Sequence, residues 1–396
     1  MYTIEMLPAA LGDCLWIEYG DRNNPSRILI DGGTVGTIDC ITSKIHAVAA
    51  REKRCRFELV VVTHIDADHI EGIIKLLGQP SLPVDIEEIW FNGNDHLPKP
   101  DERDEEQFLG GKQGDFLSAL IRKRGLPWNT YAWNGGPVYV PPRSRGKLPK
   151  CTLPGGMELT LLSPTYKELL RLSQKWEDEL TKAGLVGWED EEILEALLAS
   201  RKLAPEEEFL GEENEGFLGD EVINVEKLVD AKKKEDASPA NGSSIAFVGS
   251  FNGKQCLFAG DAYSPVLKQG VERLLEETNA MRLKLDAFKV PHHGSRGNIH
   301  DDLLATLNCH TYLISTDGTR FKHPDVEAIA RLVGGKWRPN PKNDQPIQLH
   351  FNYRTLFNGK WDDEALCRDW NYTVVFPKEK GQNDDLDHGL MVSIEP

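Results

Sequence analysis

The chain has 396 residues, seven cysteines and a formal net charge of −17, with 40% hydrophobic residues and a mean hydropathy of −0.43. No run approaches the ~20 apolar residues that a membrane-spanning helix needs, so no membrane segment is expected. The cysteines are scattered and form no CxxC pair. This excludes a zinc-finger pattern and favours reduced thiols in a cytoplasmic protein.

The negative charge is concentrated in one segment. From Thr165 to Ala240 there are 21 acidic and 10 basic residues, a net charge of −11, which leaves −6 for the rest of the chain. A uniformly acidic protein would not bind nucleic acid through bulk electrostatics. Because most of the charge lies in this segment, the total alone does not exclude a polyanionic substrate.

The predicted elements alternate between strands and helices. In the first 164 residues the apolar patterns predict strands at 3–7, 14–20, 27–33, 57–66, 84–93 and 156–164, and helices at 38–52, 70–78 and within 105–125. Residues 166–184 and 189–204 have helical spacing, and 232–242 is typical of a linker. The remainder predicts strands at 243–251, 254–261, 288–295, 311–318, 347–354, 371–377 and 389–396, with a helix near 300–307.

This order predicts an α/β fold, an αββα sandwich of two sheets packed face to face with helices outside. We expect one domain over 1–396. Residues 165–240 would form an acidic helical insertion, since so long a foreign segment is unusual inside a compact domain. Residues 336–396 would form a strand-rich C-terminal extension.

Ligand-type side chains stand at the ends of several predicted strands. The loop THIDADHIEG, residues 63–72, follows the apolar run ELVVV and offers four of them, His64, Asp66, Asp68 and His69. Others lie in LIDGG, LFAGDA, KVPHHGS and just before SSIAFV (Asp31, Asp261, His292, His293 and Asn241). Singly, each is compatible with a polar loop or turn. Together they predict a metal site, because clustered His and Asp have little structural use without an ion.

The motif HIDADH resembles the HxHxDH loop of the metallo-β-lactamase superfamily, with aspartate at its second ligand position. A fuller ordered set resembles the nuclease-like domain of the ComEC competence proteins: GDCLWIEYG with ILIDGG, THIDADHIEG, LTLLSP, NGSSIAF, LFAGDA, KVPHHGSRGN and STDGTRFKHPD. The resemblance covers about 1–163 and 241–335. It departs in having Glu71 in place of a glycine, no membrane channel, the 165–240 insertion and an unmatched C-terminal part.

The resemblance implies two divalent metal ions held by one set of ligands (His64, Asp66, Asp68, His69, Asp261 and His293). In the family arrangement His64 and Asp66 face one ion, Asp68, His69 and His293 face the other, and Asp261 bridges them. His292 and Asn241 would support the ligands from outside. Asp31 would orient the histidine loop by hydrogen bonding. No role is assigned to the other histidines considered (His46, His96, His300, His310 and His350).

Aspartate at 66 and asparagine at 241 replace histidines of the wider superfamily. Oxygen ligands favour Mn²⁺ or Mg²⁺, with Zn²⁺ as the third candidate. Two ions ~3.5–4 Å apart suit in-line displacement at phosphorus by a metal-bound hydroxide.

We therefore expect a metal-dependent phosphodiesterase, most plainly a DNase, and the resemblance implies a place in bacterial defence. Asp68 would also orient the attacking water. Four side chains after the last strands are candidate phosphate contacts (Ser295, Arg296, Arg320 and Lys322), although Arg320 and Lys322 fit a solvated turn equally well. His323 would contact a phosphate or donate a proton to the leaving oxygen.

Two alternatives remain open. The same centre can hydrolyse small molecules such as lactones, thioesters or cyclic nucleotides, because a fold does not fix a substrate. In the second alternative the protein is a regulated subunit of a larger complex that docks through the insertion. The insertion has an apolar stripe at helical spacing, Leu169, Leu172, Trp176 and Leu180. Such a stripe more often packs onto its own domain as a cap, and an acidic segment could also mimic DNA.

Overall fold

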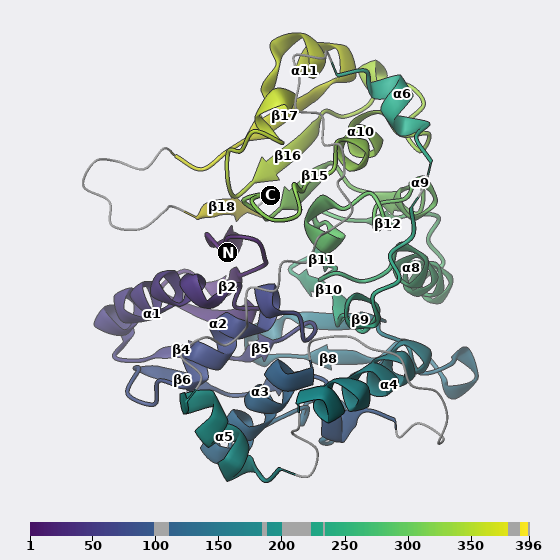
Figure 1. Cartoon of the computed structure of the whole chain (residues 1–396). Coiled ribbons are helices and arrows are strands. Elements are labelled where there is room, and N and C mark those ends of the chain that lie inside the picture. The colour runs from purple at the N-terminus through teal and green to yellow at the C-terminus, as the bar shows by residue number, and fades with distance from the viewer. Residues whose placement is uncertain (99–110, 184–187, 200–222, 233, 379–388, 395–396) are drawn as a thin grey trace.

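Two β-sheets face each other in the computed structural model, and helices cover both outer sides (Figure 1). The structure describes residues 1–98, 111–183, 188–199, 223–232, 234–378 and 389–394. For 111, 177–183, 198 and 199 it describes the backbone only. Of the described helices, none combines the length and the apolar character needed to cross a membrane. The predicted α/β sandwich is confirmed.

The first sheet has the strand order β18-β1-β2-β3-β5-β7. Strands β18, β1, β2 and β3 pair antiparallel, whereas β3, β5 and β7 run parallel. The strands span Tyr2–Met6 (β1), Leu15–Asp21 (β2), Asn24–Ile30 (β3), Leu59–Val61 (β5), Ile89–Trp90 (β7) and Leu390–Ser393 (β18). A small pair, β4 (Cys55–Phe57) and β6 (Val84–Ile86), lies apart from this sheet.

The second sheet has the order β17-β16-β15-β13-β11-β10-β9-β8. It is parallel from β11 to β17 and antiparallel from β8 to β11. Its strands are Lys150–Thr152 (β8), Glu158–Ser163 (β9), Ala246–Phe251 (β10), Lys254–Phe258 (β11), Ala287–Lys289 (β13), Thr311–Ile314 (β15), Ile347–Phe351 (β16) and Tyr372–Val375 (β17). The pair β12 (Leu283–Lys284) and β14 (Leu307–Asn308) stands alongside.

The helices fall on either side of this sandwich. In Figure 1, one group lies with the purple-to-teal half of the chain: α1 (Ile38–Glu52), α2 (Ala67–Leu77), α3 (Gly111–Arg124), α4 (Tyr166–Ala183) and α5 (Asp190–Ala199). The other lies with the green-to-yellow half: α6 (Val225–Val229), α8 (Ser264–Thr278), α9 (Asp301–Leu304), α10 (Val326–Gly334) and α11 (Glu364–Trp370). The short α7 (Pro239–Gly242) packs against α4.

Alternation along the strands explains the apolar runs in the sequence. Ile28 and Val61 belong to the core between the sheets, whereas Leu29 and Val60 pack in the second core, together with residues of α1, α2 and α3. Successive side chains of a strand point to opposite faces. A strand such as β5 is buried on both faces, which is why it reads as a continuous apolar run.

The stripe on the acidic segment packs onto the protein itself. Leu169, Leu172 and Trp176 are all buried in the core that includes α2 and α3. A Cβ on Gly114 of α3 would lie 2.1 Å from the Trp176 ring, so the glycine allows the two helices to approach closely. Leu180 and residues 200–222 lie outside the described side chains. The described part of the stripe thus forms an intramolecular interface.

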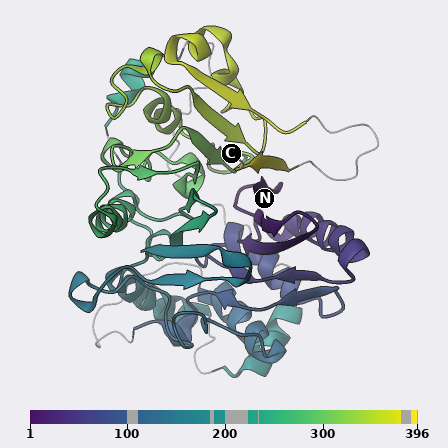
Figure 2. The same cartoon turned by 180° about the vertical axis from the view of Figure 1, so that it is seen from behind.

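Residues 336–396 contribute strands to both sheets. Strands β16 and β17 extend the second sheet, and β18 pairs with β1 at the edge of the first. The first and last strands therefore lie side by side, as Figures 1 and 2 show from opposite sides. Their pairing covers hydrogen-bonding groups of β1 that would otherwise form an open sheet edge.

The interface between α3 and α4 predicts a pH-dependent stability. Asp115 is buried, burial raises its pKa to about 7, and it accepts a hydrogen bond from Trp176 Nε1 at 3.3 Å. This pKa lies above the ordinary value of 3.8. The free energy that the protonated Asp115 side chain contributes to folding is therefore fully present below about pH 4 and is lost as the pH rises through 7. We expect Asp115→Asn to stabilise the protein relative to wild type, by about 2 kcal/mol more at pH 8 than at pH 5.5.

Urea unfolding at the two pH values measures this difference. The exposed Asp39→Asn on α1 is the matched control and should show no such change with pH. An equal effect of Asp115→Asn at both pH values would contradict the assignment.

Candidate metal centre

Four strand ends converge at one edge of the sandwich. Asp31 follows β3 directly, and His64, the first histidine of the loop, comes three residues after β5. From the other sheet, Asp261 comes three residues after β11. The pair His292–His293 lies in a 3-10 turn, Pro291–Gly294, just after β13. Parallel strands end at the same edge of a sheet, so their following loops meet there.

Helix α2 begins earlier than predicted, at Ala67. Asp66 is its N-cap residue, and Asp68 and His69 lie in its first turn instead of in a loop. The positive end of a helix dipole favours the Asp68 carboxylate at this position. Two of the four ligand-type side chains in THIDADH are therefore fixed by helical backbone.

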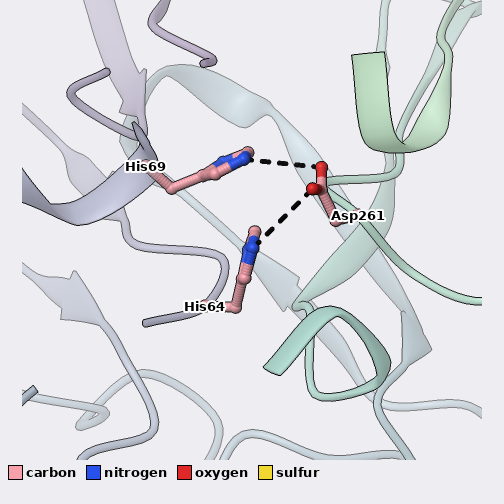
Figure 3. A group of neighbouring side chains, drawn as sticks. All are labelled: His64, His69 and Asp261. Atoms are coloured by element: carbon pink, nitrogen blue, oxygen red, sulfur yellow. Dashed lines mark ion pairs between the residues drawn. The ribbon is translucent and has the colours of Figure 1, made fainter. Parts of the chain in front are cut away.

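One group consists of His64, His69 and Asp261, whose candidate ligand atoms all lie within 4.8 Å of one another. Figure 3 shows both imidazole rings directed at the carboxylate of Asp261, a residue that belongs to the other half of the chain. The Nε2 atom of His69 is 3.5 Å from Asp261 Oδ1, and that of His64 is 3.8 Å from Oδ2. Asp66 Oδ2 approaches His64 Nε2 at 3.5 Å.

A second group shares His69 and adds Asp68 and His293. His293 Nε2 lies 3.3 Å from His69 Nε2, 3.4 Å from Asp68 Oδ2 and 3.7 Å from Asp261 Oδ2. Asp68 Oδ2 is 4.0 Å from His69 Nε2. The two groups are therefore contiguous, and Asp261 lies between them.

The hydrogen bonds of the Nδ1 atoms orient these histidines. His69 Nδ1 donates to Asp31 Oδ2 at 2.8 Å, and His293 Nδ1 donates to the Ser315 carbonyl at 2.9 Å. Thr63 Oγ1 gives its proton to Asp31, so it accepts from His64 Nδ1 at 3.0 Å. Each Nδ1 thus carries a proton, so Nε2 is the atom that presents a lone pair when the ring is neutral. Three Nε2 atoms face Asp261.

His292 points the same way. Its Nδ1 lies 3.2 Å from Asp236 Oδ2, and its Nε2 lies 3.8 Å from Asp261 Oδ2. The sequence predicts a supporting role for His292 outside the ligands, but in the structure its Nε2 turns toward the carboxylate between the two groups. Asn241 donates through Nδ2 to Asp236 at 2.8 Å.

The backbone is strained where these side chains are presented. His292 and His293 are consecutive residues with positive φ, 48° and 53°, and Asp31 has φ 58°. This region costs a non-glycine residue of order 1 kcal/mol or more and occurs where the surroundings impose it. Asp31 is held there by a hydrogen bond from its N–H to the Val61 carbonyl at 2.8 Å. Strain of this kind is typical of functional sites.

The charges of the site are strongly coupled. Burial works against the protonated form of His293, but Asp261 and Asp13 outweigh it and raise the pKa of His293 to about 10. Burial likewise works against the ionised form of Asp13, but Lys289 and His293 outweigh it and lower the pKa of Asp13 to about 2. The carboxylates are therefore ionised, and their field attracts positive charge to the facing nitrogen atoms.

The donor set fits divalent metal ions. Two of its buried atoms, His64 Nε2 and Asp261 Oδ1, have no hydrogen-bond partner in the described structure, which is costly for polar atoms at this depth. An ion ~2.1 Å from each ligand separates its ligand atoms by ~3.0–3.5 Å. The facing distances of 3.3–4.0 Å are near that spacing and mostly long for hydrogen bonds.

The site opens to solvent on one side. The side chains of Asp66 and His292 are 32% and 24% exposed, and that of Asp68 is 18% exposed. His64, His69, Asp261 and His293 are at most 4% exposed. Solvent therefore reaches the centre past Asp66, Asp68 and His292.

Asp13, which no sequence motif marked as a site residue, lies next to His293. It receives a hydrogen bond from Lys289 Nζ at 2.6 Å, and its Oδ1 is 3.4 Å from His293 Nδ1. A lysine inside the buried strand β13 was the available signal, because a buried cation requires a partner. Asp236 was also missed, and no signal in its linker-like surroundings marked it.

The four predicted phosphate contacts have different surroundings in the structure. Arg296 forms an ion pair with Glu327 at 2.8 Å, and Ser295 Oγ accepts from the Gly297 N–H at 3.2 Å. Arg320 lies over the ring of Phe321, 5.2 Å from its centroid. Lys322 follows with φ 57°. The structure thus places Arg296 in an internal ion pair and Arg320 on an exposed aromatic side chain.

His323 is a buried neighbour of His292. Its ring centroid is 5.3 Å from that of His292, and its Nδ1 is 3.5 Å from Asp325 Oδ1. Burial lowers the pKa of His323 despite the opposing effect of Asp325. The neutral imidazole is therefore favoured at neutral pH. None of the five histidines left without a role belongs to the metal-binding groups of the described residues.

Comparisons with known proteins add little to this geometry. No protein-family model matches the chain, and no curated protein matches it. Among solved structures, the short form of human tRNase Z (ELAC1) aligns over 100% of both chains with 10% sequence identity and a TM-score of 0.38. A TM-score below 0.5 does not establish a common fold, so the fold and the site stand on their own observed arrangement.

Asp261 provides the direct test of metal binding. We expect Mn²⁺ in excess to raise the Tm of the wild-type protein by mass action, and this rise to be lost in Asp261→Asn, which keeps the shape of the side chain but not its charge. Thermal unfolding with and without Mn²⁺ measures it. The exposed His46→Ala should respond like wild type. A full Mn²⁺ response in Asp261→Asn would contradict the site.

Proposed function

We propose that the protein is a metal-dependent hydrolase of the metallo-β-lactamase superfamily, related to the ComEC nuclease-like domain, that cleaves phosphodiester bonds of nucleic acid, DNA above all. The observation that carries the proposal is the convergence of histidine Nε2 atoms on Asp261 from both sheets, with Asp68 beside them. A place in defence against foreign DNA follows from the sequence resemblance alone.

Two contiguous groups around one carboxylate are the arrangement that a pair of ions requires. When bound, such ions would polarise a phosphodiester and lower the pKa of a water molecule. His64, Asp66 and His292 would hold one ion, Asp68, His69 and His293 the other, and Asp261 both. When His292 is counted, the proposed set of metal ligands contains more nitrogen ligands than the set implied by the sequence motifs. We therefore favour Mn²⁺, with Zn²⁺ next and Mg²⁺ last.

Asp68 is the chain's own candidate for directing the attacking water. It is the more exposed member of its group, and its Oδ2 faces His293 at 3.4 Å. A carboxylate oxygen at the open side can accept a hydrogen bond from water and fix its orientation toward phosphorus. His323 lies next to His292, with their ring centroids 5.3 Å apart. There a histidine can exchange a proton with the leaving oxygen, although burial works against its protonated form.

An aromatic side chain near the mouth favours a nucleic-acid substrate. The Phe321 ring is 41% exposed, lies at 27° to the His323 ring with centroids 6.1 Å apart, and carries the Arg320 guanidinium over it. Bases of single-stranded DNA stack on such rings whatever their sequence, and an arginine nearby suits the phosphate. We assign Phe321 to base stacking.

The small-molecule alternative requires an enclosed pocket at the centre. Two surface hollows of about 510 and 270 Å³ are formed by α8 with the turn after it and by residues around β8, β10 and β12, and neither includes a residue of the site. They give this alternative no support. The docking alternative requires an exposed apolar stripe on the insertion. The described part of that stripe is buried within the chain, so it is not available to a partner.

Loss of the second group should abolish catalysis. We expect Asp68→Ala and His69→Ala each to lower DNA hydrolysis by at least about 100-fold without unfolding the protein. The assay uses linear and circular DNA, single- and double-stranded, with Mn²⁺, Mg²⁺ and Zn²⁺ separately. His310→Ala, remote from these groups, is the control. Unchanged cleavage by both variants would refute the active site.

Phe321 distinguishes a nucleic acid from a small phosphodiester. Because base stacking contributes ~1–2 kcal/mol, we expect Phe321→Ala to raise KM for a single-stranded oligonucleotide by about 5–30-fold. Hydrolysis of bis(4-nitrophenyl) phosphate should change less than about twofold. Met281→Ala removes another exposed apolar side chain and serves as the control. Equal loss on both substrates would rule out base stacking.

A further inference from the structure

Asp236 lies in the last part of the acidic segment, outside every motif of the sequence analysis. Its side chain is only 9% exposed. Its Oδ2 atom accepts hydrogen bonds from the side-chain amides of Asn241 at 2.8 Å and Asn298 at 3.0 Å, and faces His292 Nδ1 at 3.2 Å. Its Oδ1 accepts from the Ser238 N–H at 2.9 Å. A carboxylate with this many donors has a fixed position.

That position determines where His292 points. With Nδ1 directed at Asp236, the ring turns Nε2 toward Asp261 Oδ2, 3.8 Å away. The two asparagine amides stand beside the same Nδ1, with Asn298 Oδ1 at 3.1 Å and Asn241 Nδ2 at 3.3 Å. A carboxylate behind a histidine fixes both its tautomer and its ring orientation, leaving the far nitrogen free for a metal.

The same network reaches the backbone of Asp261. Asn298 is fully buried, and its Nδ2 also donates to the carbonyls of Asp261 at 3.1 Å and Ala262 at 3.3 Å. Asp236 therefore contacts, through one asparagine, the loop that carries the central carboxylate. Asp236 also contacts His292, whose Nε2 atom faces the side-chain carboxylate of Asp261. Both routes end at the candidate metal centre.

The chain that brings Asp236 here is anchored to the second half of the sandwich. Helix α6 packs along α10, and Arg331 of α10 donates to the Ala231 carbonyl at 3.4 Å. Arg331 also donates to the carbonyls of Arg296 and Ile299, at 2.9 and 3.1 Å, on either side of Asn298. One buried guanidinium thus holds both the segment before Asp236 and the loop that Asp236 contacts.

We propose that Asp236 is a positioning residue for the metal centre, acting through His292, so that the end of the acidic segment is a working part of the site. The inference rests on the proposed metal centre. It assigns to the insertion a structural contribution to metal binding, distinct from docking and from covering the site.

The test is metal affinity, measured by calorimetry with Mn²⁺ alone and Zn²⁺ alone on the full-length chain. Loss of a carboxylate behind a metal-binding histidine typically weakens metal binding by about 10–100-fold, and we expect this for Asp236→Ala and Asp236→Asn. Asp230→Asn is the matched control, because Asp230 is in the same segment but forms an exposed ion pair with Lys336. It should bind both ions like wild type.

A double-mutant cycle separates positioning from general damage. If Asp236 acts through His292, adding Asp236→Ala to His292→Ala should weaken metal binding by less than about twofold. A loss as large as in the wild-type background would overturn the proposal, as would unchanged affinity in both Asp236 variants. Failure of the wild-type protein to bind either ion would overturn the metal centre itself, a result distinguishable from the other two.

Discussion

The structure depends on burying several carboxylates in the seam between its two sheets. Asp13, Asp31 and Asp261 are each at most 3% exposed, and each lies close to at least one of the histidines of the site. Ionised groups at such depth are very costly unless they are compensated. Lys289 compensates Asp13 directly. Around Asp261 the compensation comes from imidazole nitrogens, which carry protons or bind cations.

The scaffold holds those imidazole nitrogen atoms in fixed positions. Each imidazole has its Nδ1 atom bound to a group of the scaffold: Asp31 for His69, Thr63 for His64, Ser315 for His293 and Asp236 for His292. These partners come from both sheets and from the acidic segment. Rigid placement before a substrate arrives is what gives electrostatic catalysis its advantage over water. The strained backbone at His292 and His293 belongs to the same arrangement.

Much of this could be predicted from the sequence, for physical reasons. The α/β sandwich follows from apolar runs of strand length alternating with helical spacing, and the ligand-type residues follow strand ends. Helices α8 and α10 were not predicted, although both have buried apolar faces. Asp13 and Asp236 were missed because the residues that connect them to the site, Lys289 and His292, are distant in sequence and leave no local pattern. His292 could not be oriented from sequence, since its direction is set by Asp236, 56 residues away.

The pairing of the first and last strands has a consequence for how the protein is made. Strand β1 is synthesised before its partner β18, so this pairing must wait until the residues of β18 have been made. The centre matures late as well, since His69 must wait for His293, 224 residues further on. Contacts of such long sequence separation fold slowly and leave unpaired edges exposed meanwhile. A nascent chain of this kind has no complete set of candidate ligands until His293 has left the ribosome.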